Sequence, residues 1–245
     1  LEATVYQRTA ELETANDLLK QQALTIREAS LTDPLTGMHN RRFFTQHIDS
    51  EAQLAVRRYK TGSDLPIDQV DLIFFLVDID QFKRINDRQG HAAGDAVLIE
   101  MRYRLQSVFR GSDFLIRWGG EEFLAVARGA SRARAGELAE RIRTAVNGTP
   151  FRFNGNGPIE VTCSVGFAPF PFLCGRPDAL SWKETLALAD AALYAAKNAG
   201  RNAWIGFNGR DEPTGSLLSI LRASPEAALH AESIGVSRST GEGLS

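Results

Sequence analysis

The sequence predicts an α+β domain whose antiparallel central sheet is flanked by helices, with a βαββαβ core of the ferredoxin-like type. Two observations carry this prediction. Residues 71–79 form a nearly continuous apolar run rich in Phe, Ile and Val, which is typical of a buried central strand. Residues 114–118 and 122–127 have strand-like composition and flank Gly119-Gly120, which is a hairpin signal.

The other elements follow from hydrophobic periodicity. Val161, Cys163 and Val165 alternate with other residues, which predicts a strand over 160–167. The helical patterns cover residues 41–59, from just past Gly94 to 108, 134–146 and 185–198. The order is therefore strand, helix, strand, strand, helix, strand and a further helix. This fold class alone implies no function.

The N-terminal segment predicts a coiled-coil helix. It contains no Gly or Pro, and mainly apolar residues recur from Leu1 to Ala29 at alternating spacings of four and three. Arg8 and Gln22 lie in this seam and could fix its register. The alternative is one amphipathic helix packed on its own domain. The predicted organisation is a coiled-coil dimerisation helix (1–30), a globular domain (31–208) and a poorly ordered tail (209–245).

Composition excludes several classes of function. The 245 residues are 43% hydrophobic with a net charge of −2, so a core can form but no general attraction for nucleic acid polymers is expected. Two cysteines form no disulfide framework and no zinc pattern, which favours a reducing cytoplasmic setting. The longest apolar run is too short to span a bilayer, although the parent protein could be membrane-anchored.

Carboxylates mark the candidate site. Asp78 ends the predicted central strand, and Glu121 and Glu122 follow the Gly-Gly turn. If the strand lies beside the hairpin, Asp78 and Glu121 meet at one end of the sheet, where a cation would offset their repulsion. Oxygen ligands in an incomplete cage favour Mg²⁺, which shares its shell with substrate phosphates. The alternative is a charged hairpin turn that faces water.

Neighbouring residues could hold a nucleotide. A helix beginning near Phe82 would present backbone N–H groups to phosphate. Asn86 could pair with a base edge, and Asp95 could accept from a guanine N–H or cap a helix after Gly94. Two cations at the end of the last helix could clamp phosphate oxygens or interact with the helix C-terminus, namely Lys197 and Arg201.

Four motifs in order resemble the GGDEF family of diguanylate cyclases, which have a palm domain. They are Asp33-Pro34-Leu35-Thr36-Gly37-Met38-His39-Asn40-Arg41-Arg42; Asp78 to Asp87 with Gly90-His91 and Gly94-Asp95; Arg117 to Phe123; and Ala189 to Lys197 with Gly200-Arg201-Asn202. The resemblance covers about residues 31–207. One departure is Glu121, where the family name has Asp. Another is Trp118, in place of the more frequent Tyr or Phe.

The resemblance implies roles for these residues. Asp78, Glu121 and the carbonyl of Ile79 would bind two Mg²⁺ ions, which Mn²⁺ can replace. Glu121 would take the proton from a ribose 3′-hydroxyl, with Glu122 beside it in the catalytic turn. The substrate-binding residues would be Phe82, Lys83, Asn86, His91, Asp95, Gly119, Gly120, Lys197 and Arg201.

The implied reaction condenses two GTP molecules into cyclic di-GMP and two pyrophosphates. Each domain would hold one GTP, so two domains must meet around a two-fold axis. The coiled coil would hold this homodimer together by raising local concentration. A sensor domain that controls it is expected upstream of this chain.

A second site is expected at Arg110-Gly111-Ser112-Asp113. This RxxD precedes the Gly-Gly turn by the spacing that marks product inhibition in the family, and Arg141 is a plausible second arginine. Arginine can bind phosphate or a guanine edge through two hydrogen bonds. The alternative is a solvated Arg and Asp at the start of a strand.

Three rival functions remain open at this stage. The first is a catalytically inactive GGDEF domain that serves as a GTP or cyclic di-GMP receptor; such domains usually lose a carboxylate or a glycine of the turn. The second is another palm-type enzyme such as a purine nucleotide cyclase, which lacks the pair of Asn86 and Asp95. The third is a coiled-coil scaffold with an inert globular end, which leaves the acids unexplained.

Overall fold

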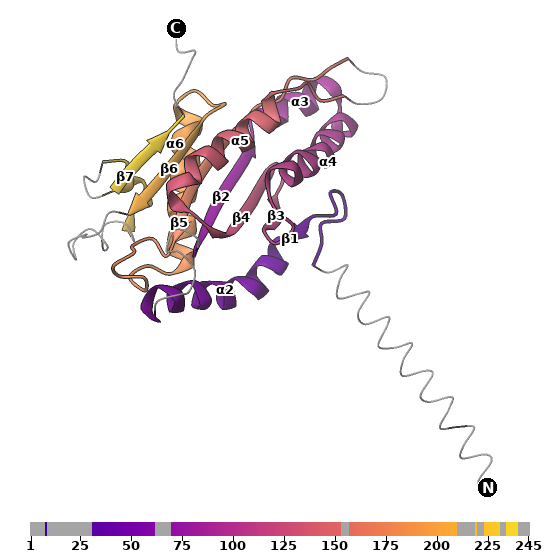
Figure 1. The fold of residues 1–245 in the computed structure, drawn as a ribbon. Helices are drawn as coiled ribbons and strands as arrows, with labels where there is room; N and C mark the ends of the chain where they lie inside the picture. The colour runs from indigo at the N-terminus through magenta and orange to yellow at the C-terminus, as the bar shows by residue number, and fades with distance from the viewer. Residues whose placement is uncertain are drawn as a thin grey trace.

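The structure is a computed structural model that describes residues 8, 31–61, 70–152, 157–209, 219, 223–230 and 234–239. Figure 1 shows a sheet with helices on both faces. The elements are β1 (His39–Asn40), α2 (Arg41–Thr61), β2 (Asp71–Ile79), α3 (Phe82–Gln89), α4 (His91–Val108), β3 (Phe114–Gly119), β4 (Glu122–Ala130), η2 (Arg132–Arg134), α5 (Ala135–Asn147), β5 (Cys163–Phe170), α6 (Trp182–Asn198), β6 (Trp204–Gly209), η3 (Pro225–His230) and β7 (Ile234–Arg238).

The sheet has the order β1-β3-β4-β2-β5-β6-β7. Its centre is β2, which pairs antiparallel with both β4 and β5. The hairpin of β3 and β4 is antiparallel as well. The inner order β3-β4-β2-β5, with α4 and α5 as the crossovers, is the ferredoxin-like arrangement, so the predicted fold class is confirmed.

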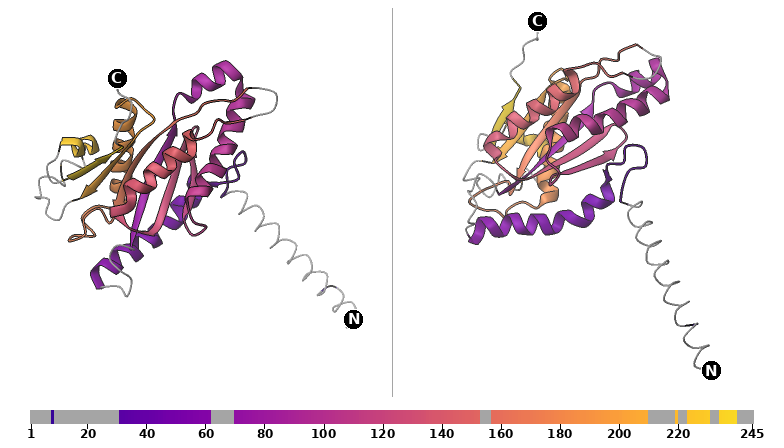
Figure 2. Two further views of the ribbon diagram at one scale, coloured as in Figure 1. Left: turned by 45° about the horizontal axis from the view of Figure 1, so that its top comes forward. Right: turned by 45° about the vertical axis from the view of Figure 1, so that its right-hand side comes forward.

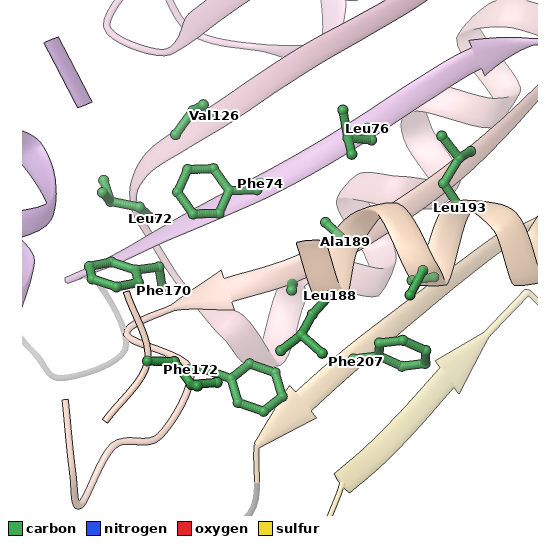
Figure 3. Packing of buried hydrophobic residues seen from close by; sticks show 14 of the residues in the cluster. Leu72, Phe74, Leu76, Val126, Phe170, Phe172, Leu188, Ala189, Leu193 and Phe207 are labelled. Atoms are coloured by element: carbon green, nitrogen blue, oxygen red, sulfur yellow. The ribbon is translucent and has the colours of Figure 1, made fainter. Parts of the chain in front are cut away.

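Alternation along β2 separates two hydrophobic layers. Leu72, Phe74 and Leu76 pack in one layer with α2 and α6, while odd-numbered residues of β2 pack in the other with α4 and α5. Figure 3 shows residues of the first layer, which come mainly from β2, β4, β5, α6 and β6. Because both faces are covered, every residue of β2 is buried. Figure 2 shows the helical layers from two further directions.

Several boundaries differ from the predicted ones. The strand predicted over 160–167 runs from Cys163 to Phe170, because its ladder with β2 pairs Ile79 with Cys163 and Leu72 with Phe170. The helix predicted after Gly94 begins earlier, at His91. Short β1 and the strand β6 were not predicted, since each depends on pairing with a distant strand.

The predictions for the two ends of the chain have different outcomes. The tail was expected to be poorly ordered, yet η3 and β7 are described there, and β7 pairs antiparallel with β6. Ala228 and Ile234 are buried in the core, which gives these two elements an apolar anchor. The coiled coil predicted over 1–30 lies outside the described residues, apart from helical, exposed Arg8.

Candidate active site

Backbone pairing brings the two predicted metal-binding carboxylates to the same end of the sheet. Asp78 of β2 lies opposite Glu122 of β4 in the antiparallel register. One residue further along β2, the backbone N–H of Ile79 donates to the carbonyl of Glu121 over 3.4 Å. The hairpin therefore places Glu121 and Glu122 beside the end of β2, as the sequence predicted.

Burial and like charges disfavour the ionised carboxylates at this end of the sheet. Burial raises the pKa of Asp78, and the negative charges of Glu121 and Asp80 raise it too, while its ion pair with Lys197 opposes them. The Lys197 ammonium lies 2.7 Å from a carboxylate oxygen of Asp78. The pKa of Glu122 is also raised, by burial and then by the charge of Asp78. This site therefore attracts a cation.

The donor set fits a magnesium ion. No cluster of three or more His, Cys, Asp or Glu residues that could hold a metal occurs in the described part of the chain. Magnesium, however, commonly uses one or two carboxylates and completes its shell with water and substrate phosphates. Asp78, Glu121 and the Ile79 carbonyl supply such a partial set. Asp78 is also the partner of the Lys197 ammonium.

Anion-binding groups surround these carboxylates. Phe82 and Lys83 open α3, where the first backbone N–H groups of a helix have no intrahelical acceptor. Lys197 lies in the last turn of α6, and exposed Arg201 follows in the turn to β6. The ammonium of Lys197 contacts the carboxylate of Asp78. Its role at phosphate stays a prediction.

Asn86, one of the two residues predicted to read guanine, lies against Gly94, which directly precedes the other, Asp95. The amide oxygen of Asn86 lies only 1.9 Å from where a Cβ on Gly94 would be, so only glycine allows Asn86 this position. Asp95 follows Gly94 inside α4 and is not an N-cap, because α4 begins at His91 and its N-cap is Gly90. His91 is exposed at the start of the same helix.

An ion pair that the sequence analysis missed holds the Gly-Gly turn. The guanidinium of Arg117 donates to both oxygens of Asp33, at 3.0 and 3.1 Å, and to the carbonyl of Gly120 at 3.0 and 3.2 Å. Gly120 has a φ of 52°, which glycine adopts without strain. Asp33 opens the first motif and Arg117 opens the third, but no local pattern in the sequence pairs them.

The predicted RxxD forms a compact turn beside a cavity. Asp113 accepts from the backbone N–H of Arg110 at 2.8 Å and from that of Arg128 at 3.0 Å. Arg141 of α5 donates to the carbonyl of Val108 at 3.0 Å. All three predicted residues line one cavity of about 300 Å³. Arg110 is exposed, and its backbone rather than its guanidinium contacts Asp113.

Comparison with known proteins identifies the family. A sequence profile described as "Diguanylate cyclase, GGDEF domain" matches residues 30–203. The chain belongs to the GGDEF family. This domain is 42% identical over 180 residues to the response regulator PleD of Caulobacter vibrioides, covering 73% of this chain and 36% of PleD. It is 39% identical over 176 residues to the diguanylate cyclase DgcP of Pseudomonas aeruginosa, covering 72% of this chain and 24% of DgcP.

A solved structure supports the same placement. The coiled coil and GGDEF domain of DgcB from Caulobacter crescentus, in complex with c-di-GMP, matches with a TM-score of 0.64 and 29% identity. The match covers 82% of this chain and 96% of that one. The curated relatives are longer, because the matched GGDEF region makes up well under half of PleD and DgcP. None of the helices that the structure describes is long and apolar enough to cross a membrane.

Proposed function

We propose that this GGDEF domain is an active, Mg²⁺-dependent diguanylate cyclase that condenses two GTP molecules into cyclic di-GMP with release of two pyrophosphates. The observation that carries the proposal is the meeting of Asp78 with Glu121 and Glu122 at one end of the sheet. Neither a carboxylate nor a glycine of the turn has been lost. An inactive receptor would not need to keep all of these charges so close together.

The geometry suggests how the chain's own residues would act. Asn86 and Asp95 would hold guanine, while the N–H groups of Phe82 and Lys83 would bind phosphate oxygens. Glu121 would accept the proton of the 3′-hydroxyl, whose oxygen forms a bond to the α-phosphorus of the other GTP as the bond to pyrophosphate breaks. Bound Mg²⁺ would supply charge stabilisation at the attacking and leaving oxygens.

The reaction requires two copies of the domain. One domain binds one GTP in this proposal, so two domains face each other around a two-fold axis and each supplies half of the site. Residues 1–30 would then hold the pair together and raise the effective concentration of one domain near the other. An upstream sensor could control activity by changing how the two domains meet.

Incubation with GTP and Mg²⁺ tests the proposed activity. The full chain should convert GTP to cyclic di-GMP and pyrophosphate, separated by chromatography. If the domains must pair, the rate per domain should rise with protein concentration until the dimer is saturated. Glu121→Gln should abolish product while GTP binding remains, because the amide keeps the size of the side chain but cannot accept the proton.

The outcomes separate the rival functions. Binding of GTP without product in the unaltered chain would point to a receptor and overturn the proposed cyclase. A cyclic mononucleotide as the product would indicate a purine nucleotide cyclase. Product from Glu121→Gln at the unaltered rate would overturn the role of this carboxylate.

We also propose that Arg110, Asp113 and Arg141 bind the product and slow turnover. Their shared cavity holds an exposed guanidinium beside a turn fixed by Asp113, which suits a ligand carrying phosphates and guanine edges. Arg110→Ala is expected to leave the initial rate unchanged while added cyclic di-GMP no longer inhibits. Initial rates with and without added product measure this, with exposed Arg57→Ala of α2, which lies outside the cavity, as the matched control. Inhibition that is unchanged in Arg110→Ala would refute the assignment.

A further inference from the structure

Asp80 is a buried carboxylate to which the mechanism above gives no role. It follows β2 directly and is 7% exposed. Although Asp78 and Asp80 lie on the same side of the strand, only Asp78 pairs with Lys197. The Asp80 carboxylate instead accepts three hydrogen bonds from uncharged donors. They come from the hydroxyls of Thr162 and Ser164, both at 2.7 Å, and from the backbone N–H of Asn202 at 2.9 Å.

The last of these contacts reaches a strained turn. Gly200, Arg201 and Asn202 connect α6 to β6, and their φ angles are 114°, 64° and 44°. Left-handed backbone is ordinary for glycine, but each non-glycine residue there is unfavourable and persists only when its surroundings enforce it. The turn therefore needs bonds that hold it, and it carries Arg201, a predicted phosphate ligand.

Asn202 is held from two sides. Its backbone N–H donates to Asp80, and its side-chain oxygen accepts from Arg143 at 3.0 Å and from Asn147 at 3.2 Å. Arg143 and Asn147 both belong to α5, on the other side of the sheet from α6. The turn is thus fastened to the end of β2 and to α5 at once. Asp80 supplies the connection to the strand that carries Asp78.

We propose that Asp80 is a positioning residue that fixes the Gly200–Asn202 turn and so aims Arg201 at the phosphates of the bound nucleotide. The end of β2 then determines both parts of the phosphate site. Asp78 would bind the metal, and Asp80 would position Arg201 through the backbone of Asn202. Burial favours this design, because hydrogen bonds are stronger and more rigid where water is excluded.

This inference rests on the proposed function for the identity of the ligand, a guanosine triphosphate. Its test uses binding rather than turnover, so the two can fail separately. The probe is 3′-deoxy-GTP with Mg²⁺, which lacks the attacking hydroxyl and cannot be condensed. Affinities are measured by calorimetry with the full chain, and thermal unfolding is recorded for every variant.

Asp80→Ala and Arg201→Ala are each expected to weaken binding about tenfold, the effect of losing one charge-assisted contact. The double variant should bind no more than about twofold more weakly than Arg201→Ala, because Asp80 acts only through Arg201. Asp80→Asn should stay within about threefold of the unaltered chain, since its amide oxygen can still accept from Asn202 and its NH₂ can donate to a hydroxyl.

Ser164→Ala is the matched control. It removes one hydrogen bond from the same Asp80 carboxylate but leaves the bond to Asn202, so its thermal stability should fall while affinity changes by less than about twofold. If Asp80→Ala does not fold, Asp80→Leu carries the same test, because its apolar side chain fills the space of the carboxylate but cannot accept from the Asn202 N–H. It should likewise show no additional effect in combination with Arg201→Ala.

Three results would overturn the inference. The first is independent effects that multiply to about a hundredfold in the double variant. The second is a loss of affinity in Ser164→Ala equal to that in Asp80→Ala. The third is the absence of any nucleotide binding by the unaltered chain, which would also overturn the proposed function. Binding without cyclic di-GMP formation would refute the cyclase alone and leave the positioning role to be decided by the variants.

Discussion

Replacing Asp78 with Asn is expected to reduce cyclic di-GMP formation by about a thousandfold, because the change removes a ligand charge from the metal site at the reacting phosphates. The fold should survive. Asn is the same size as Asp, and an uncharged amide at this buried position no longer opposes Glu121 and Asp80. The variant also loses the ion pair with Lys197, but the pKa of Asp78 is raised, so the free energy of unfolding of the metal-free domain should not fall at neutral pH.

The measurement combines product chromatography with urea unfolding of the metal-free protein. Asp190→Asn is the matched control. Asp190 is an exposed residue of α6 whose charge raises the pKa of Glu122. Its replacement by Asn therefore removes one negative charge from the same region without removing a proposed metal ligand. Its rate should fall less than about tenfold, within the range of an exposed charge. Equal losses in both variants would show that overall charge, not ligation, matters here.

Asp78 also gives the metal-free domain a pH dependence of known sign. The pKa values of Asp78 and Glu122 are raised in the folded state, first by burial and then by neighbouring charges. The folded chain therefore binds these protons more tightly than the unfolded chain does. The contribution of both groups to stability is present at low pH and is lost as pH rises from about 4 through the raised values. In Asp78→Asn, the free energy of unfolding should therefore fall less as the pH rises. Urea unfolding at several pH values measures this difference.

The sequence was sufficient where the structural signal is local. The apolar run 71–79 predicted β2 with the bounds observed, and the Gly119-Gly120 turn predicted the hairpin that carries Glu121. In the structure, alternation along β2 places Asp78 on the same side as Phe74 and Leu76, which face α6. These inferences need only the period of a strand and the conformational freedom of glycine.

The rest depends on contacts between distant segments. Asp80 meets Thr162 and Asn202, which lie 82 and 122 residues away, and no local pattern pairs these positions. Arg117 and Asp33 are 84 residues apart. The ion pair of Lys197 with Asp78 was missed for another reason. Lys197 was assigned to a phosphate, whereas the fold places its ammonium on the carboxylate of Asp78.

The second large effect is expected at the opposite end of β2. Arg132→Met should lower the free energy of unfolding by about 3–5 kcal/mol, because it leaves a buried carboxylate without its cation. The side chain of Asp71 is 1% exposed. Arg132 donates to both of its oxygens, at 2.7 and 2.8 Å, and also to the carbonyls of Pro171 and Phe172. Of the side chains that the structure describes, only that of Tyr59, whose hydroxyl donates at 2.6 Å, would still satisfy Asp71.

Urea unfolding measures this loss against two comparisons. Arg134→Met removes an exposed pair with Glu137, whose side chains are 76% and 66% exposed, so it should cost less than about 1 kcal/mol. The double variant Asp71→Leu with Arg132→Met should be more stable than Arg132→Met alone, because it no longer buries an unpaired charge. Nucleotide binding by the folded fraction should stay unchanged, since Asp71 and Asp78 lie at opposite ends of β2, about 20 Å apart. A double variant no more stable than Arg132→Met would show that the lost carbonyl contacts, rather than the unpaired Asp71 charge, determine the cost.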